Sequence, residues 1–130
     1  MRTWLELPVA RIANFSPVIV SDLSPATLRA LFATHRHERF PVVVDRQLIG
    51  VLSRRTAEAA LAAGLAPPLE PAAHCTAETP LREVQTRIIN STSQFAVVLD
   101  HEGPEGRVVG LLTLHDILRA EMLFAREQEA

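Results

Sequence analysis

The sequence predicts an α+β fold in which two repeats, each ordered β-α-β-β-α, pack face to face as one pseudo-symmetric domain. The first observation behind this prediction is an internal match between FPVVVD at residues 40–45 and FAVVLD at residues 95–100. Each of these stretches is followed by a turn and a second apolar run, at 47–53 and 107–113. A segment with helical spacing of apolar residues precedes each match, which gives both halves of the chain the same order of elements.

The helical segments before the two matches are predicted at residues 24–36 and 79–90. Each opens on a good N-cap residue followed by proline at the first helical position, where the missing N–H does no harm. These pairs are Ser24 with Pro25 and Thr79 with Pro80. An apolar stripe runs along each segment, formed by Leu28, Leu31 and Phe32 in the first and by Leu81, Val84 and Ile88 in the second.

The other elements of the two units are short. A strand is expected before each helical segment, at 17–22 and 72–77, and a closing helix at the end of each unit, at about 55–63 and 115–127. The N-terminal segment 4–13 is expected to pack against the repeats as a short helix or strand. The proline-rich stretch 64–71 is expected to connect the units rigidly. We divide the chain into residues 1–66, the N-terminal segment plus the first repeat, and residues 67–130, the second repeat.

Composition excludes several classes of function. A chain of 130 residues with 48% hydrophobic residues is large enough for one compact domain with a real core. The net charge is −2 and the basic residues are scattered, so a nucleic-acid partner is not expected. The single cysteine, Cys75, forms no internal disulfide and fits a reducing compartment. No apolar run approaches the ~20 residues needed to cross a bilayer and no signal peptide is visible, so we expect a soluble, cytoplasmic chain.

The stretch VVGLLTLHDILRA at 108–120 contains the strongest candidate for a site. Thr113 and Asp116 stand three residues apart where a helix begins, which is close to a capping box. The same residues suit a ligand, because a helix N-terminus favours phosphate, a hydroxyl donates to phosphate oxygens and a carboxylate accepts from ribose hydroxyls. The two interpretations are compatible, and the sequence leaves both open.

The repeated strands, the glycine before each final strand and the closing helices resemble a tandem pair of CBS domains, a Bateman module. The likeness runs from about Leu5 to Ala125. It implies that an adenosine nucleotide binds between the repeats, that two chains pair as a homodimer, and that the module regulates a linked enzyme, channel or transporter. The ending GLLTLHDILRAE at 110–121 is also similar to the cytosolic C-terminal region of CLC-type chloride channels and antiporters. That similarity implies a covalently linked transmembrane pore domain and a place at the cytosolic face of a membrane.

The resemblance assigns candidate nucleotide-binding residues. The family motif, glycine, two apolar residues, threonine or serine, two further residues and an acid or amide, is complete from Gly110 to Asp116. It implies that Thr113 contacts phosphate and Asp116 contacts ribose, with His115 near the phosphates. The opposite wall is implied to come from the first repeat, with Val18, His37, Glu38, Phe40 and Pro41. AMP, ADP or ATP are the implied ligands, although Glu38 is unfavourable beside a triphosphate.

The equivalent motif of the first repeat is incomplete. Ser53 keeps the hydroxyl, but Thr56 replaces the acid. A threonine cannot accept from two ribose hydroxyls as a carboxylate does. The pair Ser53 and Thr56 is therefore a weaker second site, and we expect one nucleotide per chain.

Other residues suggest three alternatives. A metal site at HRHE, residues 35–38, is not expected, because useful histidine pairs on a helix lie four residues apart. Catalysis through His74 and Cys75 is not expected, because no nucleophile elbow or ordering acid is visible, so we predict neither an enzyme nor a metal ligand. A non-binding module that serves dimerisation, or a regulator of another transporter or enzyme, remains open. Apolar residues that do not fit one narrow stripe of the last helix favour a second chain: Ile117, Leu118, Leu123 and Phe124.

Overall fold

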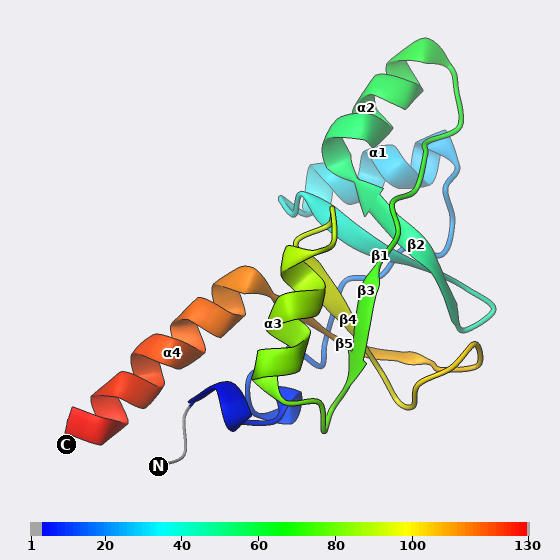
Figure 1. Ribbon diagram of the computed structural model, residues 1–130. Helices are drawn as coiled ribbons and strands as arrows, with labels where there is room; N and C mark the ends of the chain where they lie inside the picture. Colours follow the sequence, from blue (N-terminus) through cyan, green and yellow to red (C-terminus); the bar gives the residue numbers. More distant parts are fainter. Residues whose placement is uncertain (1–3, 130) are drawn as a thin grey trace.

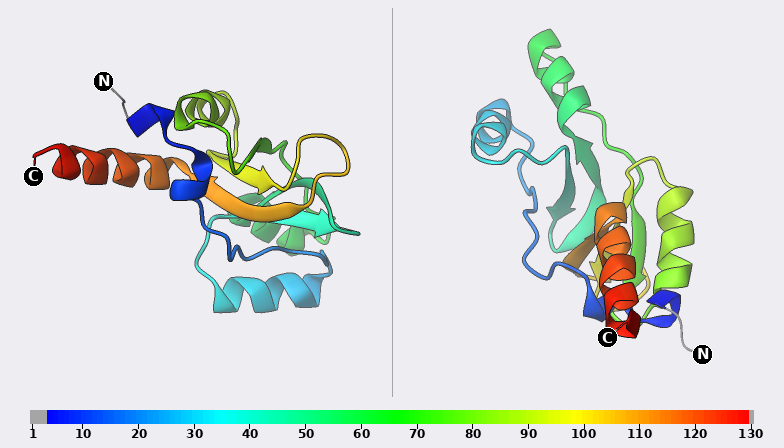
Figure 2. Two further views of the ribbon diagram at one scale, coloured as in Figure 1. Left: turned by 90° about the horizontal axis from the view of Figure 1, so that it is seen from below. Right: turned by 90° about the vertical axis from the view of Figure 1, so that its left-hand side faces the viewer.

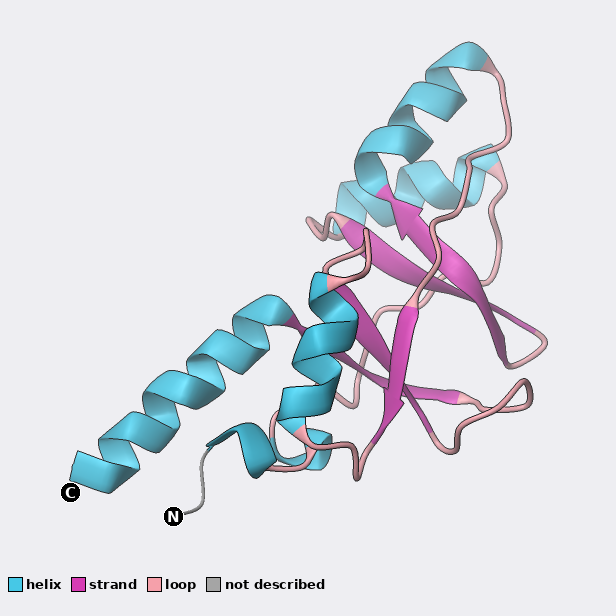
Figure 3. Cartoon of the chain, viewed as in Figure 1, coloured by secondary structure: helices cyan, strands magenta, loops and turns pink. Residues whose placement is uncertain are grey.

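The computed structural model describes residues 4–129 and places them in two small sheets that face each other, with helices on their outer sides (Figures 1 and 2). Helices and strands are mixed along the chain, as the predicted α+β fold of two repeats requires (Figure 3). Within residues 4–129, no helix is long and apolar enough to span a membrane. The predicted units 1–66 and 67–130 include residues 1–3 and 130, which lie outside the described residues.

The first repeat is built on a β-hairpin. Its elements are α1 (Pro25–Thr34), β1 (Arg39–Val44), β2 (Gln47–Ser53) and α2 (Arg54–Ala63). Strands β1 and β2 are antiparallel. The turn between them holds Asp45 and Arg46 at φ of 52° and 68°, the left-handed pair that suits a two-residue hairpin.

The second repeat has the same order with one more strand in its sheet. Its elements are β3 (Ala73–Thr76), α3 (Leu81–Ile89), β4 (Phe95–Leu99), β5 (Val108–Thr113) and α4 (Leu114–Glu129). Strand β3 pairs with β4 in parallel, and β4 pairs with β5 antiparallel. All five residues of β4 are buried, because this strand lies between two neighbours and has packing on both faces.

The strand predicted at 17–22 is wrong in extent. Only Val20 pairs, in a single parallel bridge to Val42. The Val20 N–H donates to the Pro41 carbonyl at 2.9 Å, and the Val43 N–H donates to the Val20 carbonyl at 2.8 Å. The next hydrogen bond backwards along this parallel ladder would run from the N–H of residue 41 to the Val18 carbonyl. Residue 41 is a proline without an N–H, so the pairing does not extend back from Val20.

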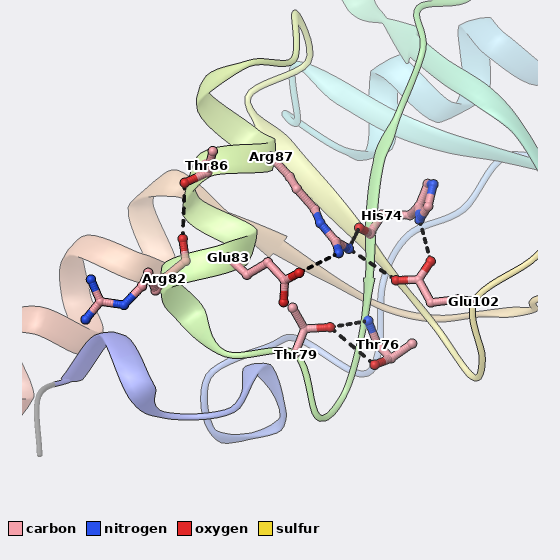
Figure 4. Close-up of polar contacts among 8 residues, drawn as sticks. All are labelled: His74, Thr76, Thr79, Arg82, Glu83, Thr86, Arg87 and Glu102. Carbon is pink, nitrogen blue, oxygen red and sulfur yellow. Dashed lines mark hydrogen bonds and ion pairs between the residues drawn. The ribbon is translucent and has the colours of Figure 1, made fainter.

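One of the two predicted helix caps is displaced. Helix α1 begins at Pro25 with Ser24 in the N-cap position, as expected, but the Ser24 hydroxyl makes no capping hydrogen bond and contacts the side chains of Asp22 and Thr27. Helix α3 begins at Leu81, with Pro80 in the N-cap position. The Thr79 hydroxyl instead accepts the N–H of Thr76 at 3.0 Å, so this side chain closes the turn after β3 and does not cap the helix (Figure 4).

The N-terminal segment packs against the second repeat. It forms two short 3₁₀ helices, η1 (Trp4–Glu6) and η2 (Val9–Arg11). The Val9 N–H donates to the Thr79 carbonyl at 2.8 Å, and the Leu81 N–H donates to the Leu7 carbonyl at 2.9 Å. Val9 is fully buried in the core of the second repeat. The predicted division between residues 66 and 67 separates the repeats along the sequence and stays a prediction.

The strand pairing corrects the alignment of the two repeats by one residue. Val42 pairs with Gly50, and Val98 pairs with Gly110, so these two pairs are equivalent. Phe40 therefore corresponds to Ala96, although the sequence match sets Phe40 against Phe95. A shift of one residue along a strand exchanges its two faces. Phe40 accordingly packs beneath the helices of its own repeat, whereas Phe95 packs between the two sheets.

Three buried clusters hold the molecule together. The first repeat has a core of Val20, Leu28, Phe40, Val42, Leu52 and Ala57. The second has a larger core of Val9, Cys75, Leu81, Val84, Ile88, Ala96, Val98, Leu112, Ile117 and Ala120. A third cluster, which we call the inter-repeat core, lies between the sheets and contains Val51, Phe95, Val97 and Leu99. Because both sheets contribute to this cluster, the repeats form a single packed unit.

The segment that leads into each repeat pairs with the last strand of the other repeat. Asn14 and Leu111 of β5 exchange two hydrogen bonds of 2.8 Å each, and Glu70 and Val51 of β2 exchange two of 2.9 Å each. A glycine makes each close approach possible. A Cβ on Gly110 would lie 2.8 Å from the Asn14 carbonyl oxygen, and a Cβ on Gly50 would lie 3.0 Å from the Leu69 Cβ. The glycine of the sequence motif is therefore required by these two crossings.

Candidate functional site

The predicted pair at the start of α4 forms a reciprocal capping box. The Thr113 N–H donates to Asp116 Oδ2 at 3.0 Å, and the Asp116 N–H donates to Thr113 Oγ1 at 3.1 Å. This confirms the capping interpretation. Both side chains are half-buried, and within the described part of the chain Asp116 Oδ1 takes part in no hydrogen bond. The arrangement thus leaves one carboxylate oxygen at a helix N-terminus for another partner.

The equivalent residues of the first repeat form no such box. Ser53 is the N-cap of α2 by position, but its side chain makes no capping hydrogen bond. The Thr56 hydroxyl donates to the Ser53 carbonyl at 3.3 Å. Ser53 is buried with 7% of its surface exposed, whereas Thr56 is exposed. Without an acid, the start of α2 offers only hydroxyl groups, which cannot accept from two ribose hydroxyls as a carboxylate does.

The five residues predicted for the opposite wall lie in two settings. His37 and Glu38 are exposed in the loop between α1 and β1. Val18 is half-buried against the first-repeat core, and Pro41 is buried in β1. Phe40 is fully buried in that same core, so its side chain is not free to stack on a base and only its backbone remains for a ligand.

The structure brings the wall residues together in part. The rings of His37 and Phe40 have centroids 5.6 Å apart, and those of His35 and His37 are 5.8 Å apart. No hydrogen bond or ion pair among residues 4–129 joins Thr113, His115 or Asp116 to the first-repeat group. Neither Thr113 nor Asp116 lines any of five surface cavities in the described chain.

Sequence reasoning missed Arg54, which holds the loop before β1. Its Nε donates to the His37 carbonyl at 3.0 Å and its Nη1 to the Phe32 carbonyl at 3.2 Å, while Nη2 donates to the His35 carbonyl. The guanidinium carbon lies 4.7 Å above the centre of the Phe32 ring. Arg54 is the first residue of α2. A cation there opposes the helix macrodipole, and this was the available signal that the side chain is used elsewhere.

His74 and Cys75, considered above for catalysis, have other partners. His74 Nδ1 lies 3.0 Å from Glu102 Oε2, and the same carboxylate pairs with Arg87 at 3.1 Å (Figure 4). Arg87 also donates to the His74 carbonyl at 2.7 Å and pairs with Glu83. These contacts attach the loop after β4 to β3 and α3. Among the described residues, no group of three His, Cys, Asp or Glu side chains is placed to hold a metal ion.

The buried Cys75 thiol is expected to be unreactive. Burial raises the pKa of Cys75 to about 12, the Arg87 charge acts in the opposite direction, and the Glu102 charge adds to the effect. Iodoacetamide at pH 8 should therefore modify the folded chain at less than about a hundredth of the rate of the unfolded chain, because the thiolate is the nucleophile. Mass spectrometry with and without denaturant measures both rates. Equal rates would show that Cys75 reaches solvent in the folded state.

The class of protein follows from this geometry. Two repeats of the same α-β-β-α order face each other, each preceded by an extended segment that is a strand in the second repeat and a single bridge at Val20 in the first. They exchange their lead-in segments, and a threonine–acid pair follows the last strand of the second repeat. A sequence profile of the CBS domain matches residues 9–63 and 68–123. The chain belongs to the CBS domain family, as a tandem pair.

Solved structures agree with this fold. The CBS domain of a bacterial CNNM/CorC family Mg²⁺ transporter has a TM-score of 0.76 at 22% identity, over 90% of this chain and 76% of that chain. A CBS domain of that transporter family in complex with ATP gives a TM-score of 0.73 at 22% identity, over 92% and 89%. The CBS-pair protein CBSX2 from Arabidopsis thaliana gives 0.72 at 18% identity, over 92% and 96%. At these identities the likeness establishes the fold alone. Comparison with curated proteins gives no match.

Proposed function

We propose that this CBS pair is a regulatory module that binds one adenosine nucleotide per chain at Thr113 and Asp116. The observation that carries the proposal is the half-buried Asp116 carboxylate, which caps α4 through Oδ2 and leaves Oδ1 without a hydrogen bond in the described residues. A carboxylate in this position accepts from ribose hydroxyls, while the Thr113 hydroxyl and the helix N-terminus favour phosphate. Binding of ATP by a related CBS domain supports the choice of ligand.

The proposed ligand is AMP or ADP in preference to ATP. His37 and His115 are exposed and favour phosphate when they are protonated, whereas the exposed Glu38 repels a third phosphate. Arg54 holds the loop that carries His37 and Glu38 by donating to the carbonyls of His35, His37 and Glu38, so the N–H groups of the loop keep a fixed position for the adenine edge. The Val18, Phe40 and Pro41 contacts of this wall are proposed on the family pattern.

The proposed target of regulation is a membrane transport protein joined to the chain, with the module at the cytosolic face. Two of the similar structures are CBS domains of a Mg²⁺ transporter family, which supports a transporter as the parent. The similarity of residues 110–121 to CLC-type chloride channels and antiporters makes a chloride pathway the other candidate. In either case the ligand acts through its different affinities for two arrangements of the repeats.

Asp116→Ala is expected to weaken nucleotide binding about 10- to 100-fold, because one charged acceptor of two hydroxyl groups is lost. The same change removes one of the two hydrogen bonds of the capping box, while the backbone N–H of residue 116 still donates to the Thr113 hydroxyl, and should lower the free energy of unfolding by about 1 kcal/mol or less. Isothermal titration with AMP, ADP and ATP measures the affinities, and circular dichroism measures the stability.

Thr56→Ala is the matched control, since Thr56 occupies the position of Asp116 in the first repeat. It should leave the affinity unchanged. If Asp116→Ala lowers the stability but leaves the nucleotide affinity unchanged, Asp116 only caps the helix and does not contact the ligand. Absence of binding to the wild-type chain would refute the proposed function.

A second candidate function, dimerisation without a ligand, is favoured by the surface of α4. This helix projects beyond the rest of the second repeat (Figure 2). Ile117 is fully buried, so its predicted contact with a partner chain is excluded. Leu118, Met122 and Leu123 are half exposed or more. Sedimentation of the wild-type chain and of Leu118→Glu tests this candidate, because a dimer built on α4 dissociates when a charge enters its apolar face.

A further inference from the structure

An ion pair lies across the inner face of the first-repeat sheet. Arg39 Nε is 3.6 Å from Glu70 Oε2, a distance too long for a hydrogen bond. Both atoms are buried and have no hydrogen-bond partner within the described chain. The two side chains retain only 32% and 28% of their surface exposed.

The strand pairing fixes where this ion pair runs. Arg39 of β1 is opposite Ser53 of β2, and Glu70 pairs with Val51 on the other edge of β2. Opposite residues in a ladder point to the same face, and so do residues two apart on one strand. Val51 belongs to the inter-repeat core. The ion pair of Arg39 and Glu70 therefore crosses β2 on the sheet face that points towards the second repeat, beside Ser53.

The second repeat has no ion pair at the equivalent place. Phe95 is opposite Thr113, and Asn14 pairs with Leu111, so these residues take the positions of Arg39 and Glu70. Phe95 is 5% exposed and belongs to the inter-repeat core, while Asn14 is exposed and uses its side chain to accept the Ser16 N–H at 2.9 Å. The surroundings of Thr113 thus contain no charge of this kind.

The charges of the ion pair act against a nucleotide at Ser53. The Glu70 carboxylate repels phosphate and neutralises the guanidinium that would otherwise attract it. The side chains also cover the sheet surface next to the Ser53 hydroxyl. To enter, a ligand must separate the facing atoms Arg39 Nε and Glu70 Oε2, which are buried and have no hydrogen-bond partner in the described chain.

We propose that Arg39 and Glu70 are specificity-determining residues, whose ion pair closes the first-repeat site to adenosine ligands. This inference rests on the proposed function and adds that the missing acid at Thr56 is not the only reason for one ligand per chain. The ion pair occupies the place of the ligand, and the nucleotide is confined to the site of Asp116.

Titration of three forms of the chain tests the inference. Thr56→Asp restores the acid of the motif and should still bind one nucleotide per chain. The triple variant Thr56→Asp, Arg39→Ala, Glu70→Ala should bind two. A second nucleotide in Thr56→Asp alone, or a single one in the triple variant, would overturn the inference while leaving the proposed function intact.

If no form of the chain binds nucleotide, the proposed function is refuted but the inference about the ion pair is not. A measurement without nucleotide then tests whether the ion pair covers Ser53. A thiol at Ser53→Cys should react with a maleimide at least tenfold faster when Arg39→Ala and Glu70→Ala are also present. Thr113→Cys is the matched control, and its rate should not change with those substitutions. An unchanged rate at position 53 would show that the ion pair does not cover the site, and the inference would fall.

Discussion

Phe40→Ala is expected to lower the free energy of unfolding by about 3–5 kcal/mol. The ring has no exposed surface and lies in the first-repeat core with Val20, Leu28 and Val42. Its centroid is 6.1 Å from that of Phe32, so the substitution leaves a cavity under α1 that the neighbours fill only in part. Urea or thermal unfolding followed by circular dichroism measures the loss.

A second phenylalanine supplies the control for this substitution. Phe15 is 46% exposed, and Phe15→Ala should cost less than about 1 kcal/mol. A weaker nucleotide affinity in Phe40→Ala without loss of stability would contradict the structure, because it would place the ring against the ligand. The result therefore separates the core position of Phe40 from the ligand contact that the family resemblance implies.

Gly110→Ala is expected to destabilise the fold by about 1–3 kcal/mol, since overpacking at a closely packed position costs energy of this order. The new Cβ would lie 2.8 Å from the Asn14 carbonyl oxygen, and the two hydrogen bonds of 2.8 Å between Asn14 and Leu111 would have to stretch. Backbone atoms cannot turn away as a flexible side chain does. Thermal unfolding measures the effect.

Gly50→Ala is the equivalent substitution in the first repeat and should also destabilise the fold. Its Cβ would meet the Leu69 Cβ at 3.0 Å and the Glu70 carbonyl oxygen at 3.1 Å, and the φ of 158° at Gly50 adds backbone strain for any residue with a side chain. Equal stability of Gly110→Ala and the wild-type chain would show that the N-terminal crossing moves without cost.

The sequence allowed the repeats, the helices and the hairpins to be predicted, because these depend on local spacing and on turn residues. The phase of the repeats was wrong by one residue, since Phe40 and Phe95 look alike in the sequence but lie on opposite sheet faces. Local patterns also predicted too long a strand at 17–22. The chain pairs with β5 at Asn14 and with β1 at Val20, and the path between these two bridges sets how much of the segment can pair.

The candidate site was predictable where it is local. Thr113 and Asp116 stand three residues apart, and their capping box follows from that spacing. The contacts of Arg54 with the loop before β1 and of Arg39 with Glu70 join residues far apart in the sequence. Such contacts depend on the strand register. A one-residue error in the alignment of the strands places these side chains on the wrong face, so the contacts were not predictable from the sequence.

Asn14 pairs with β5 and Glu70 pairs with β2, so the last strand of each repeat has a neighbour that comes from the segment leading into the other repeat. A gene fragment that ends in the proline-rich connector would encode a half whose outer strand lacks its neighbour, with bare amide and carbonyl groups along the edge. Anyone who duplicates this module or transfers it to another protein must therefore keep both repeats together.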